Sequence, residues 1–486
     1  NVQRGAATGG DVQQVLLENL IETNSFTRWE AFYQVINRCN TVIQHAPEVA
    51  EKDPNYTNGD MRANIAEAKA LRALCYFYLI RTFRDVPYVT TASTDDSDIE
   101  ASYRVPATKF NDVLNALIAD LEGVRDDAVK IYPQVGYPVG EDFNSGRITR
   151  FGIDALLCDM YLWAGQYAKC METANRVLNF KKDRYNELLE EDGESLELEL
   201  FADQYPLVPE QLRGNTAGNA YDAIFGTGHS FESIFELGFI NNYGNENKMI
   251  ADYFGSTSNS QGQLFAAEAM ATGVYGSTAN ELWNWDDCRF AEFISEEGSN
   301  FLIRKYARQS CSVQIGTESS KEAMTSGSMR STNHANWIIY RMTDVMLMKA
   351  EAAVELSEAT GVDSTDVAFE LVQVINRRGR NLSEADAKNL KRDDYRSIPL
   401  MRELVQDERR RELMFEGKRW FDLVRVALRE KSNTNLIAQV IKKHTENTNA
   451  IRIKLGKTDA LFWPINRTEL DVNPNLSQNP AYQTKD

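Results

Sequence analysis

The chain has 486 residues, of which 43% are hydrophobic and 26% charged, so it is long and apolar enough to bury a large core. Its net charge of −18 excludes a general affinity for nucleic acids and for anionic membrane surfaces, since both attract basic proteins. No apolar run approaches the roughly 20 residues that a membrane-spanning helix needs.

The N-terminus, Asn1-Val2-Gln3-Arg4, lacks an initiator Met and the charged and apolar stretches of an export signal. We therefore expect that any signal has been removed. A lipid-bearing cysteine, if the protein has one, is expected upstream of Asn1.

Helical periodicity dominates residues 11–182. A helix over 108–124 is predicted with Thr108 as its N-cap, and residues 149–180 predict a helical hairpin with its turn at 165–167. This hairpin is similar to a tetratricopeptide repeat, although no regular period continues along the chain. In segment 66–80, apolar residues recur every three or four positions and predict one buried helical stripe: Ala66, Ala70, Ala73, Phe77 and Ile80.

Residues 183–333 change to loop-rich and partly extended sequence, with Gly, Ser and Asn abundant in 255–262. Aromatic residues are concentrated here, because 16 of the 86 residues from Tyr221 to Tyr306 are Phe, Trp or Tyr. Aromatic loops on a rigid scaffold are a common place for binding.

Helices return in residues 334–486, over 342–356, 365–378 and 401–428, and the last 55 or so residues are predicted to be extended. The expected fold is mainly α: a tetratricopeptide-like scaffold of helical pairs with a loop-rich, partly extended aromatic middle region. We expect one unit over 1–486, made of these three parts.

Sequence motifs of catalysis are not found. His45, His229, His334 and His444 lack metal-ligand spacing, and there is no nucleophile elbow or phosphate-binding loop, so no catalytic residue, metal or cofactor is predicted. A pair of carboxylates at glycosidase separation stays open as a less favoured alternative. Cys288 and Cys311 either pair in an oxidising compartment or remain free thiols.

The segment Trp283-Asn284-Trp285-Asp286-Asp287 is the centre of the predicted binding site. If it is extended, both indoles face the same side and form a platform on which a sugar ring can stack. The alternative is that these rings pin the loops onto the helical core. The predicted ligand-binding residues are Trp283, Trp285, Tyr275, Tyr253, Asp287 and Arg289.

The basic run Arg409-Arg410-Arg411 is either an anion site or part of a self-neutralised helix. We favour the second interpretation, because acids lie three or four positions from the bases. The expected pairs are Asp407 with Arg411, Arg409 with Glu412, and Glu416 with Arg419.

Several segments carry recognisable motifs. The most specific is ERRRELMFEGKRWFDLVR at 408–425, and others are WIIYRMTDVMLMKAEA at 337–352, VINRRGR at 374–380, and the closing segments 462–465 and 473–482. Together with 68–77 and Val86-Pro87, they resemble the SusD/RagB family over residues 29–482. Met342 and Thr343 depart from the usual Tyr and Ala of that family.

The resemblance implies a lipoprotein on the outer membrane of Bacteroidetes, exposed at the cell surface, with a tetratricopeptide-like core and no catalytic activity or cofactor. It implies polysaccharide utilization, in which the protein binds a glycan and delivers it to a SusC-like TonB-dependent transporter. Members of this family usually carry residues before the point where this chain starts. Peptide binding, as in some branches of the family, and a scaffold that binds only proteins remain alternatives.

Overall fold

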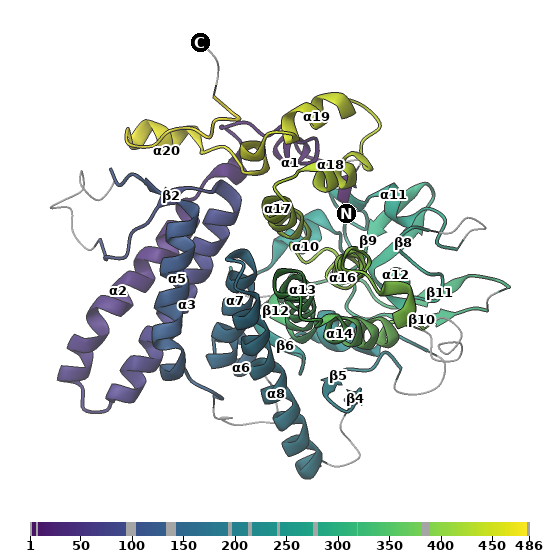
Figure 1. The fold of residues 1–486 in the computed structure, drawn as a ribbon, viewed down its shortest axis with the longest axis horizontal. Helices are drawn as coiled ribbons and strands as arrows, with labels where there is room; N and C mark the ends of the chain where they lie inside the picture. The colour runs from purple at the N-terminus through teal and green to yellow at the C-terminus, as the bar shows by residue number, and fades with distance from the viewer. Residues whose placement is uncertain are drawn as a thin grey trace. The chain divides into compact units, whose positions relative to one another are not determined.

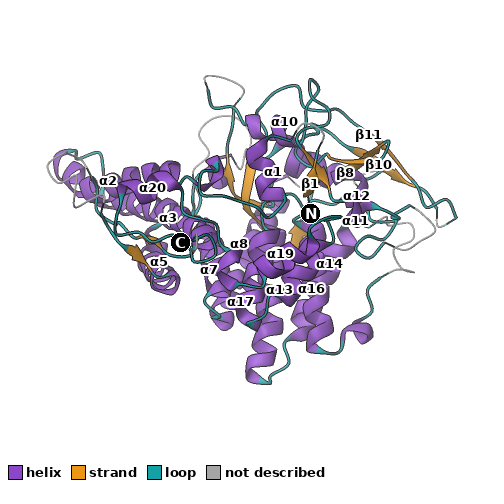
Figure 2. Ribbon diagram, turned by 90° about the horizontal axis from the view of Figure 1, so that it is seen from above, coloured by secondary structure: helices purple, strands orange, loops and turns teal. Residues whose placement is uncertain are grey.

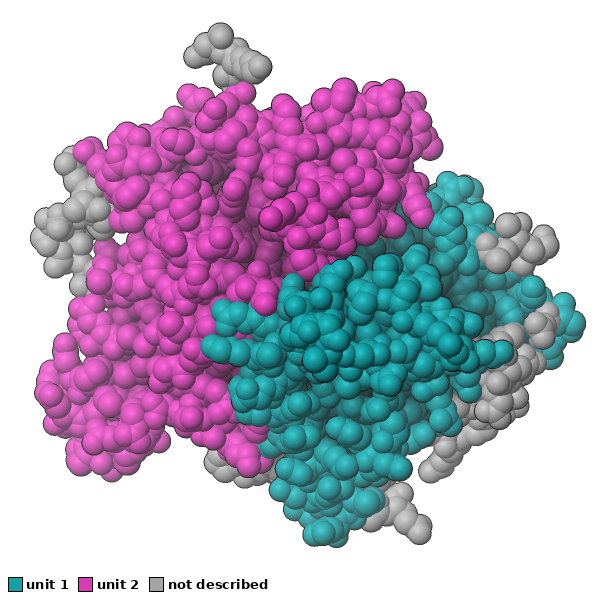
Figure 3. All heavy atoms as spheres, in the orientation of Figure 1, with its two compact units in different colours: residues 1–8, 134–147, 166–419 teal, residues 9–133, 148–165, 420–486 magenta. Residues whose placement is uncertain are grey.

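The computed structural model describes residues 2–5, 8–93, 104–132, 142–192, 197–211, 216–240, 244–275, 280–317, 319–380 and 389–483 (Figure 1). The described chain is mainly helical, as predicted, with short strands between the helices (Figure 2). It divides into two compact units, each assembled from separate stretches of sequence: unit 1 holds 1–8, 134–147 and 166–419, and unit 2 holds 9–133, 148–165 and 420–486 (Figure 3). The division of the chain into three parts by composition, at 11–182, 183–333 and 334–486, remains a prediction.

Unit 2 is built around helix α3, which packs against α2 and α5. A capping box starts α3, in which Thr57 Oγ1 accepts a hydrogen bond from the Asp60 amide and the Thr57 amide donates to the Asp60 carboxylate. The five residues of the predicted stripe are all buried, so this prediction is confirmed. The helices of this unit are α1 (Gly10–Leu16), α2 (Glu30–Lys52), α3 (Asn58–Phe83), α5 (Phe110–Val124), α7 (Arg150–Trp163), α18 (Thr434–Ile441), α19 (Thr448–Leu455), α20 (Arg467–Val472) and, from its second residue, α17 (Arg419–Glu430).

Thr108 is not the N-cap of its helix, contrary to the prediction. It lies in β3 (Ala107–Thr108), which pairs with β2 (Val86–Pro87), so its backbone is committed to a sheet. The N-cap residue is Lys109, and the Asp85 carboxylate accepts a hydrogen bond from the Phe110 N–H at 3.0 Å. A side chain distant in sequence thus accepts a hydrogen bond from a backbone amide at the N-terminal end of α5, which has no acceptor within the helix.

The C-terminal segment predicted to be extended contains the short helices α18, α19 and α20. Leu436 and Val440 of α18 pack with Ile451 and Leu455 of α19 in a separate apolar cluster. Their spacing of four residues is helical, but each helix has only eight residues. Helices this short depend on such packing, which local periodicity does not reveal.

Unit 1 has α13 at its centre, in contact with α8, α14 and α16. Helix α13 is buried on almost all sides and ends at Gly361, whose φ of +72° is a left-handed conformation that favours glycine. The helices of unit 1 are α6 (Asp142–Gly146), α8 (Tyr167–Asp192), α9 (Asn219–Tyr221), α10 (Lys248–Tyr253), α11 (Glu268–Ala271), α12 (Cys288–Phe293), α13 (Met342–Thr360), α14 (Thr365–Arg378) and α16 (Ile398–Glu412).

The strands of unit 1 form small antiparallel sheets beside these helices. One sheet has the order β1-β7-β9-β8, and in another β12 pairs with β6, which lies in the region predicted to be partly extended. The strands are β1 (Val2–Arg4), β4 (Glu199–Phe201), β5 (Tyr205–Leu207), β6 (Ser233–Leu237), β7 (Leu264–Ala266), β8 (Ile294–Glu297), β9 (Asn300–Ile303), β10 (Ser312–Ile315), β11 (Ala323–Ser326) and β12 (Trp337–Arg341).

Both helices predicted over 149–180 are present as α7 and α8, and the chain between them turns at Gly165 with φ of +67°. Within the described ranges, no helix is both long and apolar enough to cross a bilayer.

Candidate functional site

The predicted aromatic platform lies in the interior of unit 1. Trp283 is 2% exposed and Trp285 is 8% exposed, and both belong to the apolar core of the unit. The rings of Trp283 and Tyr275 both meet Phe290 edge to face, with centroids 5.7 and 5.4 Å from it. Burial favours the packing role that the sequence left open for these tryptophans, while ligand contact stays a prediction.

The remaining predicted residues lie in or beside two helices, α12 and α10. Asp287 caps α12, and its carboxylate accepts the amide N–H of Arg289. Tyr253 is half-buried at the end of α10, and Tyr275 is also half-buried. The structure thus gathers Trp283, Tyr275, Asp287 and Arg289 around α12.

Helix α12 is held against the end of α14 by backbone contacts. The Cys288 amide donates to the Gly379 carbonyl at 2.8 Å, and Asp287 and Arg380 form an isolated β-bridge. The Arg289 side chain passes directly over Gly379, because a Cβ there would lie 2.9 Å from Arg289 Cζ and closer still to Nε. Only glycine leaves room for this close approach.

Replacing Gly379 with alanine should therefore lower the free energy of unfolding by roughly 1–3 kcal/mol, because the added methyl group displaces a buried guanidinium. Urea denaturation measures the loss. Gly123→Ala is the control, since nothing lies within 4 Å of its Cβ position and alanine favours the helix α5. Equal stability of the two variants would contradict the close approach.

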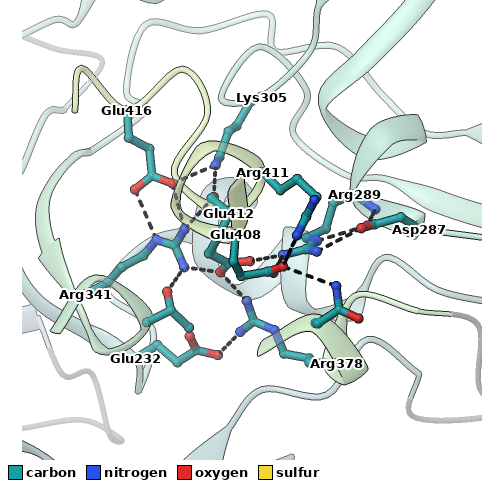
Figure 4. A network of polar contacts seen from close by, with 12 residues as sticks. Glu232, Asp287, Arg289, Lys305, Arg341, Arg378, Glu408, Arg411, Glu412 and Glu416 are labelled. Carbon is teal, nitrogen blue, oxygen red and sulfur yellow. Dashed lines mark hydrogen bonds and ion pairs between the residues drawn. The ribbon is translucent and has the colours of Figure 1, made fainter. Parts of the chain in front are cut away.

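Arg289 is the first of two hubs in a buried network of charges (Figure 4). Its guanidinium binds Asp287 through two hydrogen bonds of 2.8 and 2.9 Å. The same group reaches Glu408 at 2.8 Å and Glu412 at 2.7 Å, both on α16. Because Arg289 is only 1% exposed, these acids replace the water that the cation loses on burial.

Glu412 is the second hub. Its carboxylate accepts hydrogen bonds from Arg289, Arg341 and Arg378, and Arg378 also binds Glu232 at 2.6 Å. Burial alone would raise the pKa of Glu412, but Arg378, Arg341 and Arg289 outweigh it and hold the pKa well below its ordinary value. Glu412 is thus an ionised carboxylate in the interior.

A third carboxylate, Glu416, extends the network beyond α16. Arg341 binds it at 2.7 and 3.1 Å, and Lys305 Nζ lies 2.6 Å from it. Burial lowers the pKa of Lys305 to about 8, although Glu416 opposes this shift. Glu416 lies between Phe415 and Gly417, which both have a positive φ.

The signature segment is structural, as expected, but its partners differ from those predicted. Glu412 and Glu416 pair with cations of α12, α14 and β12 and with Lys305, and Arg409 binds Asp344 at 3.1 Å. Sequence reasoning missed Glu232, Lys305, Arg341 and Arg378. The signal was the spacing of Glu408 and Glu412, since two acids four residues apart lie on one face of a helix.

Every cysteine is a free thiol, including the buried Cys288 and Cys311, so the structure has the second of the two states that the sequence left open. In the part of the chain that the structure describes, no group of three or more His, Cys, Asp or Glu side chains is arranged to hold a metal ion.

A sequence model of the SusD family matches residues 214–482, more than half of the chain. The chain belongs to the SusD family. A second model, described as "Starch-binding associating with outer membrane", matches residues 10–124. The acids at positions 408–416 of the charged network therefore lie within the part of the chain that the SusD model matches.

Known relatives agree with this assignment. SusD-like protein P2 of Formosa agariphila is 25% identical over 437 residues, which cover 84% of this chain and 74% of the relative. A SusD superfamily protein of Bacteroides thetaiotaomicron has a similar fold, with a TM-score of 0.67, 20% identity, and coverage of 99% and 91% of the two chains. A SusD-like carbohydrate binding protein of Bacteroides fragilis has a TM-score of 0.63, 18% identity, and coverage of 98% and 91%.

Proposed function

We propose that this protein captures an oligosaccharide at the outer surface of the outer membrane and delivers it to a SusC-like TonB-dependent transporter. Membership of the SusD family carries this proposal. The description of the model that matches residues 10–124, and the carbohydrate-binding neighbour from Bacteroides fragilis, support a sugar ligand.

Binding in this proposal is reversible and involves no chemical conversion. Sugar rings stack through their C–H faces on aromatic side chains, while nearby polar groups orient the hydroxyls. The cations and carboxylates at the centre of the network are buried and bound to one another. They are therefore better placed to support a binding surface than to exchange protons with a ligand.

The predicted contact residues remain a proposal for the location of the site. Within the set, Tyr253 and Tyr275 are only half-buried, so they can present part of a ring without rearrangement. Trp283, Trp285, Asp287 and Arg289 are buried and would support the surface from behind unless the segment opens.

Isothermal titration against a panel of plant, fungal and host glycans, with peptides as the comparison, tests the ligand class. We expect one glycan class to bind and peptides to give no heat. Tyr275→Ala and Tyr253→Ala should weaken binding, and Tyr395→Ala, a half-buried tyrosine outside the set, should not. Peptide binding without glycan binding would replace this proposal with peptide capture.

Delivery requires contact with the transporter. The protein, purified from its native outer membrane in mild detergent, should bring a TonB-dependent transporter with it. Recovery of the protein alone, under conditions that keep other outer-membrane complexes intact, would contradict the proposed delivery step.

A further inference from the structure

The first strand of the chain is added to the edge of a sheet in unit 1. Strand β1 pairs with β7 in an antiparallel ladder that runs from Val2 opposite Ala266 to Arg4 opposite Leu264. It lies at one end of the strand order β1-β7-β9-β8, and Val2 packs against the apolar core of the unit. Because β1 has only three residues, contacts beyond this ladder are needed to hold it.

Gln263 joins this strand to the rest of the unit. Its carbonyl accepts hydrogen bonds from the Gly5 amide at 3.0 Å and from the Thr8 hydroxyl at 2.8 Å. The same hydroxyl lies 2.8 Å from the Gly5 carbonyl, so it closes the turn that follows β1. In the opposite direction, the Gln263 amide donates to the Asp252 carbonyl at 3.0 Å. One residue therefore connects residues 2–8 to α10.

The C-terminal end of α10 depends on this connection. Asp252 lies in the last turn of the helix, where backbone carbonyls have no donor within the helix. The helix has only six residues, too few to be stable without tertiary contacts. Gly262 packs so closely against the Tyr253 carbonyl that a Cβ atom at residue 262 would clash with it. Residues 262–263 thus hold the end of α10 in place.

One face of α10 is partly exposed. Met249 and Tyr253 are four residues apart, so their side chains lie on the same side of the helix. Met249 is 50% exposed and Tyr253 is half-buried. A thioether next to an aromatic ring provides apolar surface on which a sugar ring can stack. This surface keeps its shape only while the helix is ordered.

We propose that residues 2–8 form a clamp, which orders α10 through Gln263 and so holds Tyr253 where it contacts the glycan. The inference rests on the proposed function, because it gives the N-terminal strand a role in ligand binding. The clamp residues position the helix and do not touch the ligand. Loss of the clamp leaves the core of the unit folded and loosens only α10 and the loop after it.

Two substitutions weaken the clamp and leave Tyr253 in place. Thr8→Val keeps a branched side chain of similar size and removes the hydroxyl that binds the Gln263 carbonyl. Gly5→Ala adds a Cβ atom 2.8 Å from the same carbonyl oxygen, so the strand must move away. Gly10→Ala is the matched control, because nothing lies within 4 Å of its Cβ position.

Hydrogen exchange tests the clamp without a ligand. Amides of residues 248–266 should exchange about threefold to tenfold faster in Gly5→Ala and Thr8→Val than in the wild type and Gly10→Ala, as expected for the loss of one hydrogen bond. Amides of α13, at the centre of the unit, should exchange at the same rate in every protein, since the core stays folded. Unchanged exchange at 248–266, or equal acceleration in α13, would overturn the clamp.

Titration with soluble starch, xylan, β-glucan and mucin glycans tests the link to binding. The glycan that binds the wild type should bind Gly5→Ala and Thr8→Val about threefold to tenfold more weakly, and Gly10→Ala equally well. In a protein that already carries Tyr253→Ala, adding Thr8→Val should weaken binding no further, because the clamp acts through this tyrosine.

The outcomes separate this inference from the proposed function. If a glycan binds the wild type and both clamp variants with equal affinity, the inference is overturned and the proposed function stands. If Thr8→Val weakens binding equally with and without Tyr253, the clamp does not act through Tyr253 and the inference is again overturned. If the wild type binds none of these glycans, both fail.

Discussion

Replacing Glu412 with glutamine should lower the free energy of unfolding by about 3–5 kcal/mol, the cost expected when one partner of a buried ion pair is removed. Glu412 is 1% exposed and faces three guanidinium groups, those of Arg289, Arg341 and Arg378. Glutamine has nearly the same shape but no charge, and its NH₂ group cannot accept a hydrogen bond. The loss therefore reports the electrostatic role of the hub and not a change in packing volume.

Urea denaturation of the two proteins measures this effect. Glu403→Gln, an exposed acid on the same helix, is the control and should change stability little. Acid should act like the substitution, because the folded pKa of Glu412 is lowered: its contribution is present above the ordinary carboxyl pKa and is lost as the pH falls. A Glu412→Gln protein as stable as Glu403→Gln would show that the remaining acids suffice.

Replacing Trp283 with alanine should also cost about 3–5 kcal/mol, because it leaves a cavity beside Phe290 in the core of unit 1. The indole Nε1 is buried and donates no hydrogen bond. Trp283→Phe should therefore retain more stability than Trp283→Ala, since it keeps a ring and loses no polar contact.

Chemical denaturation and glycan titration of the two folded variants distinguish packing from ligand contact. If Trp283 packs, stability falls in Trp283→Ala and the affinity of the protein that remains folded changes little. Unchanged stability with abolished binding would instead support the sugar-stacking role predicted from the sequence.

The sequence correctly predicted those helices that are determined by their own hydrophobic periodicity. The stripe from Ala66 to Ile80 and the boundaries near α13 and α14 follow from local periodicity, and the family follows from motifs spread along the chain. The caps were harder to predict, since Asp85 reaches the start of α5 from 25 residues away.

The candidate site could not be predicted to the same extent. Its aromatic platform assumed an extended segment, but the Asp287 amide bonds to the Asn284 carbonyl in a turn that leads into α12. Strand alternation therefore does not apply to Trp283 and Trp285. The ion-pair partners of the acids on α16 could not be inferred either, because Arg289 lies 119 residues from Glu408 and 123 residues from Glu412 in the sequence.

The network has a consequence for biogenesis. During synthesis, Arg289, Lys305, Arg341 and Arg378 emerge before the acids at 408–416 with which they pair. Contacts this distant in sequence form slowly, and incomplete chains expose surfaces that aggregate. Unit 1 therefore reaches its final fold only after its last helix has been made, and a chain truncated before residue 408 should be a substrate for chaperones and proteases.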